Sequence, residues 1–278
     1  MKINFIADFF SDQVLGGGEL NNKELIDYMI SDGHEVTSIN SHMVTSNFIE
    51  RNSQDCFIVA NFINLNKESI VSLYDKKYII YEHDHKYLTT RDPSKFKDFA
   101  APPEAIINQG FYRKAHAVLC QSQYHLDIVS KNLQDVNLIS LGGNLWPEAS
   151  LDLMSEISEL PKKDAYAIMD SDFSHKNTSE AVAYCEHKKL QYTLIKSDSY
   201  EEFLKMMGEN KTFVFLPKTP ETLSRIVVEA RMMGMSVIVN KMIGATREEW
   251  YKQKGKDLID TMRKKRTEIK DLVVRELS

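Results

Sequence analysis

The chain has 278 residues, and its hydrophobic fraction of 42% and charged fraction of 27% are ordinary for a folded globular protein. The composition excludes a disordered chain, and no apolar run approaches the roughly 20 residues that cross a bilayer. The formal net charge of −5 argues against tight, charge-driven binding to nucleic acid. Three widely spaced cysteines are expected to be free thiols, and the N-terminus lacks the pattern of a signal peptide. We therefore expect a cytoplasmic protein, and the length favours two modest domains.

Apolar strand patterns alternate with helical patterns through the first half of the chain. The first strand is expected at 2–8, a glycine cluster follows at Gly16, Gly17 and Gly18, and a helix then runs to Gly33. This alternation predicts an α/β fold with a mainly parallel sheet, in which ligand loops follow the carboxyl ends of strands. Further strands are expected at 34–40, 55–62, 77–84, 117–122 and 137–143.

An acidic segment without a strand pattern, bracketed by Pro147 and Pro161, ends this half. The alternation then restarts, and the chain after Arg247 is charged and helix-forming. Strands of the second half are expected at 165–170, 191–196, 211–217 and 235–240, with helices at 177–189, 199–210 and 224–233. The domains predicted in this way are a first lobe at 1–146, a linker with a short helix at 147–163, a second lobe at 164–247 and a C-terminal helix at 248–278.

The last strand–loop–helix–strand segment carries the sharpest pattern. The amides of Thr222, Leu223 and Ser224 stand at the start of its helix, where unpaired N–H groups and the helix dipole favour an anion. Glu221 precedes that start, and Glu229 lies within the helix, from where its side chain can lean back. Amides suit a phosphate and carboxylates suit sugar hydroxyls, so the pattern indicates a ligand that carries both. A capped helix with a solvated glutamate explains the spacing of the two acids equally well.

Three motifs are distributed over the two halves of the chain. PETLSRIVVEA in the second half has the pattern Pro-Glu-x-x-(Gly/Ser)-x-x-x-x-Glu-Ala. GGGELNNKELIDYMISDGHEV and AHAVLCQSQYHLDIVSKN in the first half have a glycine loop with its helix and turn, and a strand with its following helix. In their order along the chain, these motifs resemble the retaining glycosyltransferases of family four. The resemblance implies the GT-B fold, with two Rossmann-like lobes facing a cleft, a compact second lobe, and a C-terminal helix that crosses back to the first lobe.

Three positions match family residues near the donor diphosphate. Gly16 and Gly17 match the glycine loop that approaches the diphosphate and the transferred sugar, and Lys176 matches the lysine that neutralises the leaving diphosphate. The family's arginine about six residues before that lysine is missing, because the stretch MDSDFSHK holds acidic residues there. The charge of the leaving group would then rest on Lys176, the helix amides and Arg225.

Three further positions match family residues that contact sugar. Glu221 matches the acid that contacts the hydroxyls of the transferred sugar, Glu229 matches the acid that holds the ribose hydroxyls, and His83 matches a histidine near the reacting sugar. A glycine of the family signature is replaced by Ser224, and the second lobe is short by about one βα unit. His83 has acidic and histidine neighbours, but alternation along a strand separates adjacent side chains, so no metal site is expected.

The combined pattern predicts a retaining, metal-independent hexosyltransferase. Its substrate would be a nucleotide-diphospho-sugar such as a UDP- or GDP-sugar, without a cofactor, and its acceptor a hydroxyl group. We expect a carbohydrate acceptor, bound by first-lobe loops that include 8–15 and 83–103, because most of the family glycosylate saccharides or lipid-linked glycans. The second loop interleaves basic and aromatic residues, so glucosylation of hydroxymethylated DNA bases remains an alternative.

Two other interpretations remain open. The missing arginine and the short second lobe are compatible with a non-catalytic GT-B module that binds a nucleotide or a sugar. An unrelated nucleotide-binding α/β protein, such as an oxidoreductase, is disfavoured, because the glycine cluster lacks the GxGxxG spacing and the ribose-binding acid that follows it.

Overall fold

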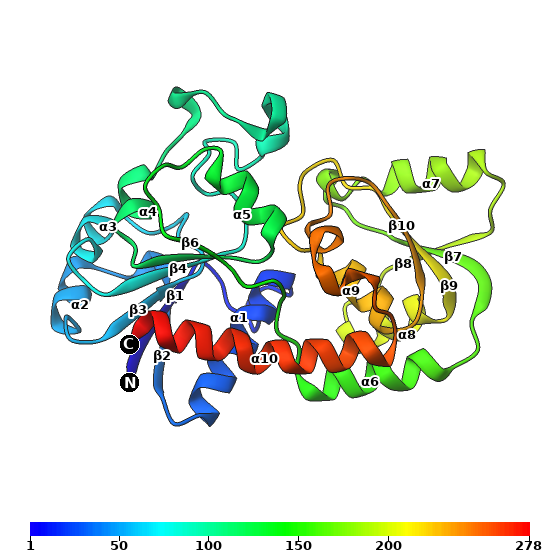
Figure 1. Ribbon diagram of the computed structural model, residues 1–278, viewed down its shortest axis with the longest axis horizontal. Helices are drawn as coiled ribbons and strands as arrows, with labels where there is room; N and C mark the ends of the chain where they lie inside the picture. The colour runs from blue at the N-terminus through cyan, green and yellow to red at the C-terminus, as the bar shows by residue number, and fades with distance from the viewer. The chain divides into compact units, whose positions relative to one another are not determined.

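The computed structural model describes residues 1–278, and the chain folds into two compact units. The first comprises Met1–Leu145 with Arg266–Ser278, and the second comprises Trp146–Lys265 (Figure 1). Each unit contains one parallel sheet with helices on its faces, so the predicted α/β class is confirmed. No helix is both long enough and apolar enough to span a membrane.

The sheet of the first unit has six strands in the order β2-β1-β3-β4-β5-β6. Successive side chains of each central strand point to opposite faces, and both faces are apolar, as in parallel sheets that helices cover on both sides. The strands are β1 (Lys2–Ala7), β2 (Glu35–Asn40), β3 (Cys56–Val59), β4 (Tyr78–Glu82), β5 (Ala117–Cys120) and β6 (Leu138–Ser140); the helices are α1 (Gly17–Ser31), α2 (Ser46–Arg51), α3 (Lys67–Leu73), α4 (Gln109–Lys114) and α5 (Gln123–Ser130).

The sheet of the second unit has four strands in the order β10-β9-β7-β8. The segment 147–163, expected as a linker with a short helix, contains α6 and is grouped with this unit. The strands are β7 (Lys163–Met169), β8 (Tyr192–Ile195), β9 (Asn210–Phe215) and β10 (Ser236–Val239); the helices are α6 (Glu148–Glu159), α7 (Thr178–His187), α8 (Tyr200–Gly208) and α9 (Arg225–Met232). Helices α6, α8 and α9 cover one face, and α7 covers the other.

The C-terminal helix α10 (Lys256–Leu277) starts eight residues later than the expected Glu248. Two 3-10 turns occupy 244–247 and 249–252, and Gly255 then adopts a positive φ of 58° that interrupts a regular helix. From Arg266 onward α10 belongs to the first unit, where it packs an apolar stripe against the sheet and pairs Lys270 with Asp32 at 2.8 Å.

Both sheets have a topological switch point, where strand order reverses. In the first unit it lies between β1 and β3, and in the second unit between β7 and β9. Ligands of open α/β sheets bind at the carboxyl ends of the strands beside such a point. The fold therefore favours a binding site at the loops that follow β1, β7 and β9.

Candidate functional site

Lys176 and Glu221 form an ion pair at the switch point of the second unit. Lys176 ends the turn that follows β7, and Glu221 lies in the loop that follows β9. The Lys176 Nζ and Glu221 Oε1 atoms are 2.8 Å apart, with 26% and 14% of the two side chains exposed. Asn177 Nδ2 donates to the Leu216 carbonyl at 2.9 Å, which holds the two loops together. A cation and a carboxylate thus stand side by side where the fold places ligands.

The loop of Glu221 leads directly into helix α9. The Glu221 amide donates to the Met242 carbonyl at 2.8 Å, which anchors the loop beside β10. Helix α9 begins at Arg225, one residue later than expected, so Thr222 and Leu223 precede it and Ser224 is its N-cap. Ser224 adopts a φ of 75°, and its buried hydroxyl makes no hydrogen bond. No N-cap side chain therefore occupies the positive end of the helix dipole.

Glu229 lies inside α9 and leans back toward the helix start. Its Oε1 accepts hydrogen bonds from Trp146 Nε1 at 2.9 Å and from the Tyr200 hydroxyl at 2.7 Å. Arg225, one turn earlier, places its Nε 3.6 Å from the same oxygen and its guanidinium over the Trp146 ring. Only 3% of Glu229 and 8% of Arg225 are exposed. Burial raises the pKa of Tyr200, and the charge of Glu229 acts in the same direction.

Gly16 and Gly17 lie at the switch point of the first unit. Gly16 is the N-cap of α1, and Gly17 is its first residue. A side chain at Gly16 would collide with Glu19, since a Cβ atom there would lie 2.2 Å from Glu19 Oε2. The glycine therefore lets the Glu19 carboxylate fold back over the start of α1. Burial raises the pKa of Glu19, against an opposing effect of Lys86.

His83 follows β4 and contacts the first turns of α1. Its Nε2 lies 2.6 Å from Asn22 Oδ1, and its ring stands edge-on to Tyr81 with the centroids 5.0 Å apart. Gly18 lies beside the same ring, since a Cβ atom there would be 3.5 Å from the ring. His83 thus stands at the same sheet edge as Gly16, because β1 and β4 are both parallel members of this sheet.

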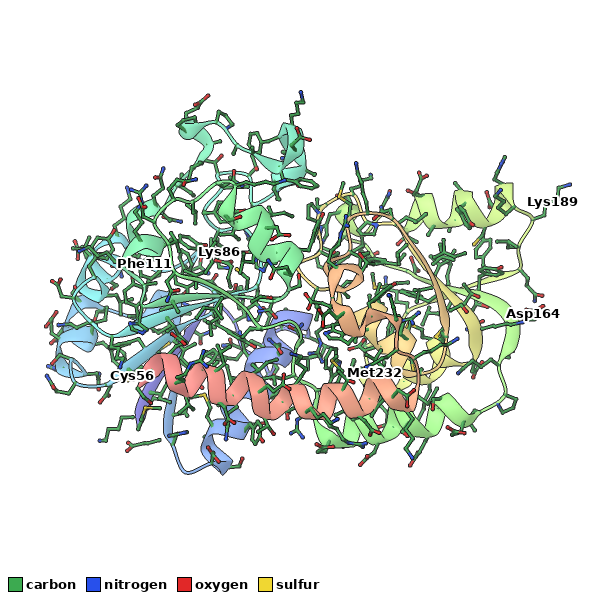
Figure 2. The ribbon with its side chains drawn as sticks, viewed as in Figure 1. Cys56, Lys86, Phe111, Asp164, Lys189 and Met232 are labelled. Atoms are coloured by element: carbon green, nitrogen blue, oxygen red, sulfur yellow. The ribbon has the colours of Figure 1, made fainter.

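The neighbours of His83 form an ionic network that extends from the protein interior to the surface. Lys86, wholly buried within the first unit (Figure 2), donates to Glu82 at 2.6 Å and to Asp84 at 2.5 Å, and Arg91 pairs with Asp84. Burial raises the pKa of Glu82 to about 7, although Lys86 opposes the change. Burial acts on Asp84 in the same direction, but the charges of Lys86 and Arg91 outweigh it and lower its pKa. No group of three or more His, Cys, Asp or Glu side chains is arranged to hold a metal ion.

The predicted residues therefore form one group in each unit. Gly16, Gly17 and His83 lie in the first, whereas Lys176, the loop 221–224, Arg225 and Glu229 lie in the second. Sequence reasoning missed Trp146 and Tyr200, which hold Glu229, and Asn22, which contacts His83. The only available signals were a tryptophan beside the expected linker and an unusual pair of asparagines one turn after the glycine cluster.

Known structures provide an independent comparison. HepE of Anabaena, solved with UDP, matches with a TM-score of 0.57 at 13% identity, covering 100% of this chain and 96% of HepE. The HepE structure with UDP-glucose gives the same TM-score at 12% identity and the same coverage. An alpha-glucosyltransferase in complex with UDP and a 13-mer DNA containing an HMU base matches with a TM-score of 0.52 at 12% identity, covering 97% and 95%.

Comparison of the sequence with known families and proteins finds no relative. No protein-family model matches the chain, and no curated protein matches it in sequence. The structural matches nevertheless span nearly the whole chain and both of its parallel sheets. The chain has the GT-B fold of the glycosyltransferases.

Proposed function

We propose that this protein is a metal-independent, retaining glycosyltransferase that takes a nucleotide-diphospho-sugar, with UDP as the first nucleotide to test. The observation that carries the proposal is the Lys176–Glu221 pair beside the start of α9. This arrangement offers a cation and a helix dipole to a diphosphate, and a carboxylate to sugar hydroxyls. The HepE structures, which share this fold, contain UDP or UDP-glucose, and this supports the choice of nucleotide.

The proposed reaction breaks the bond between the sugar C1 atom and the diphosphate oxygen. A bond from the acceptor oxygen to C1 forms on the same face of the sugar, and the acceptor proton passes to the departing phosphate oxygen. Lys176, Arg225 and the amides at the start of α9 would stabilise the negative charge of the leaving group. Glu221, His83 and the loop of Gly16 would orient the sugar, and Glu229 would hold the ribose.

The proposal is tested with nucleotides and nucleotide sugars in a thermal-shift assay, followed by a turnover assay. A ligand that binds only the folded state raises the melting temperature. We expect UDP and a UDP-sugar to raise it, the Lys176→Ala variant to respond less, and wild-type protein to hydrolyse the UDP-sugar slowly without acceptor, with or without a chelator. A thermal shift without any turnover would favour a non-catalytic binding module, and no shift with any nucleotide would refute the proposal.

A saccharide hydroxyl is the acceptor that we favour. Two of the four basic residues of the basic–aromatic segment 83–103 are paired, because Lys86 pairs with Glu82 and Asp84 inside the protein and Arg91 pairs with Asp84. The other two, Lys95 and Lys97, are exposed cations. The segment contains four basic and three acidic residues, and the formal net charge of the whole chain is −5. Such a surface is poorly suited to the many phosphate contacts of a DNA-binding protein.

A modified DNA base is the second candidate acceptor. The similarity to an alpha-glucosyltransferase crystallised with DNA containing an HMU base is the observation that favours it. A gel-shift assay with plain and hydroxymethylated duplexes at two salt concentrations separates the candidates. Salt-sensitive duplex binding with sugar transfer to the modified base would identify DNA as the acceptor. No duplex binding at low salt would support the saccharide acceptor.

A further inference from the structure

The side chains of Asn22 on α1 and His83 at the end of β4 are in direct contact. The Asn22 Oδ1 and His83 Nε2 atoms are 2.6 Å apart, across 61 residues of sequence. The amide oxygen carries no proton, so the bond requires a hydrogen on Nε2. In the neutral ring, Nδ1 is then the nitrogen that accepts hydrogen bonds. The partner on α1 therefore selects one of the two tautomers of His83.

The rest of the surroundings fixes the plane of the ring. Tyr81 meets the His83 ring edge-on at an interplanar angle of 87°, and the Tyr81 hydroxyl accepts a 2.7 Å hydrogen bond from Asn21 Nδ2. A Cβ atom at Gly18 would lie 3.5 Å from the ring, so this turn of α1 runs close beside it. Two consecutive asparagines of one helix thus hold the two aromatic rings at the end of β4.

Asn22 is a poor choice for stability alone. It is wholly buried, and its Nδ2 atom has no hydrogen-bond partner. A buried donor without a partner disfavours folding, and an apolar side chain of similar size would avoid that cost. Its benefit must then lie in the group that Oδ1 contacts, which is the ring of His83.

We propose that Asn22 is a positioning residue, which holds His83 in the Nε2–H tautomer so that Nδ1 accepts a hydrogen bond from a sugar hydroxyl. The role toward sugar rests on the proposed function, whereas the control of the tautomer does not. Asn22 itself touches no substrate in this proposal. Its effect reaches the reaction only through the orientation and protonation of His83.

The decisive experiment records the ring nitrogens of His83 by NMR on protein labelled with 15N-histidine, at a pH where the ring is neutral. The His83→Gln spectrum assigns the signals. We expect a proton on Nε2 that exchanges slowly with water in wild-type protein and in Asn22→Asp, which retains an acceptor oxygen. Asn22→Leu should lose this slow exchange. A proton on Nδ1, or unchanged exchange in Asn22→Leu, would overturn the proposal.

Turnover of UDP-glucose provides the second readout. Asn22→Leu should lower kcat on the order of 10-fold at an unchanged KM for the donor, and Asn22→Asp should restore it. Should leucine disturb the packing, Asn22→Ser removes the same contact, because its side chain is too short to reach His83. Equal kcat values in all folded variants would refute the role in catalysis.

A matched control separates positioning from stability. Asn132 is another buried asparagine of the first unit, and its Nδ2 donates to the Phe99 and Ile128 carbonyls, not to His83. Asn132→Leu should lower the melting temperature but leave the His83 signals unchanged. If the wild-type protein shows no turnover at all, the proposed function fails, and the NMR experiment still decides whether Asn22 controls the tautomer.

Discussion

Lys176 donates a 2.8 Å hydrogen bond to Glu221, although 45 residues separate them in the chain. The pair lies where the loops after β7 and β9 meet at the switch point of the second sheet. Glu221 thus neutralises the positive charge of Lys176, which the proposed function directs at the leaving diphosphate. Donor binding would then exchange one anionic partner of Lys176 for another.

This exchange predicts opposite effects of two substitutions on UDP affinity. Lys176→Ala should weaken UDP binding by about tenfold or more, since a hydrogen bond to a charged group contributes roughly 1.5–3 kcal/mol. Glu221→Gln should bind UDP at least as tightly as wild type, because it removes the competing carboxylate, yet transfer sugar more slowly. Isothermal titration calorimetry with UDP measures both affinities. Lys218→Ala, at an exposed position on the loop after β9, is the control, and a loss of affinity in Glu221→Gln equal to that in Lys176→Ala would contradict the exchange.

Glu229 should matter for both stability and nucleotide binding. Glu229→Ala removes the oxygen shared by Trp146 and Tyr200 and the carboxylate beside Arg225. Breaking such a buried group costs about 3–5 kcal/mol of unfolding free energy, which urea denaturation measures. Glu229→Gln retains an acceptor for both donors, so it should unfold closer to wild type and still bind UDP more weakly. Wild-type UDP affinity in Glu229→Gln would remove this residue from the proposed site.

The order of the elements could be predicted from the sequence, because strand and helix patterns are local. Every expected strand is present, with its ends shifted by a few residues, since short apolar runs and glycine stops depend only on neighbouring residues. The start of α10 was predicted wrongly at Glu248, because charged, helix-forming residues continue through the two 3-10 turns before Lys256. Composition alone does not reveal the positive φ of Gly255 that separates them.

The contacts of the candidate residues could not be predicted in the same way. Nothing local to Glu229 indicates that Trp146, 83 residues earlier, donates to it. Trp146 was expected at the end of the first lobe, yet it is grouped with the second unit, where it packs under Arg225. Such pairs depend on the tertiary fold, and local sequence patterns do not indicate which distant residues it brings together.

Ser224 is expected to lower the stability of the second unit. Its φ of 75° lies in the left-handed region, which costs a residue with a Cβ atom about 1–2 kcal/mol, and its buried hydroxyl has no partner. Ser224→Gly should therefore raise the unfolding free energy by about 1 kcal/mol in urea denaturation. Ser224→Ala keeps the backbone cost and is the control for loss of the hydroxyl. Equal stability of the glycine and alanine variants would show that the backbone conformation carries no cost.

The buried His85 predicts a loss of stability in acid. Burial lowers the pKa of His85 from 6.5 to about 4, while Asp84 opposes and Lys86 reinforces the change. Because the pKa in the folded state lies below that in the unfolded state, the contribution of His85 is fully present above pH 6.5 and is lost as the pH falls toward 4. The interval corresponds to about 3 kcal/mol of unfolding free energy.

Urea denaturation at pH 7 and pH 4 tests this prediction, because it measures how much unfolding free energy wild type and His85→Gln each lose between the two pH values. Wild type should lose about 3 kcal/mol more than His85→Gln over this range, because glutamine does not titrate. Glu82 and His125 also have shifted pKa values, but they are present in both proteins, so subtraction largely removes their contributions. His116→Gln, at a position whose side chain is 52% exposed, should behave like wild type. If His85→Gln loses as much stability as wild type, His85 does not remain neutral in the folded protein, and the acid sensitivity belongs to other groups.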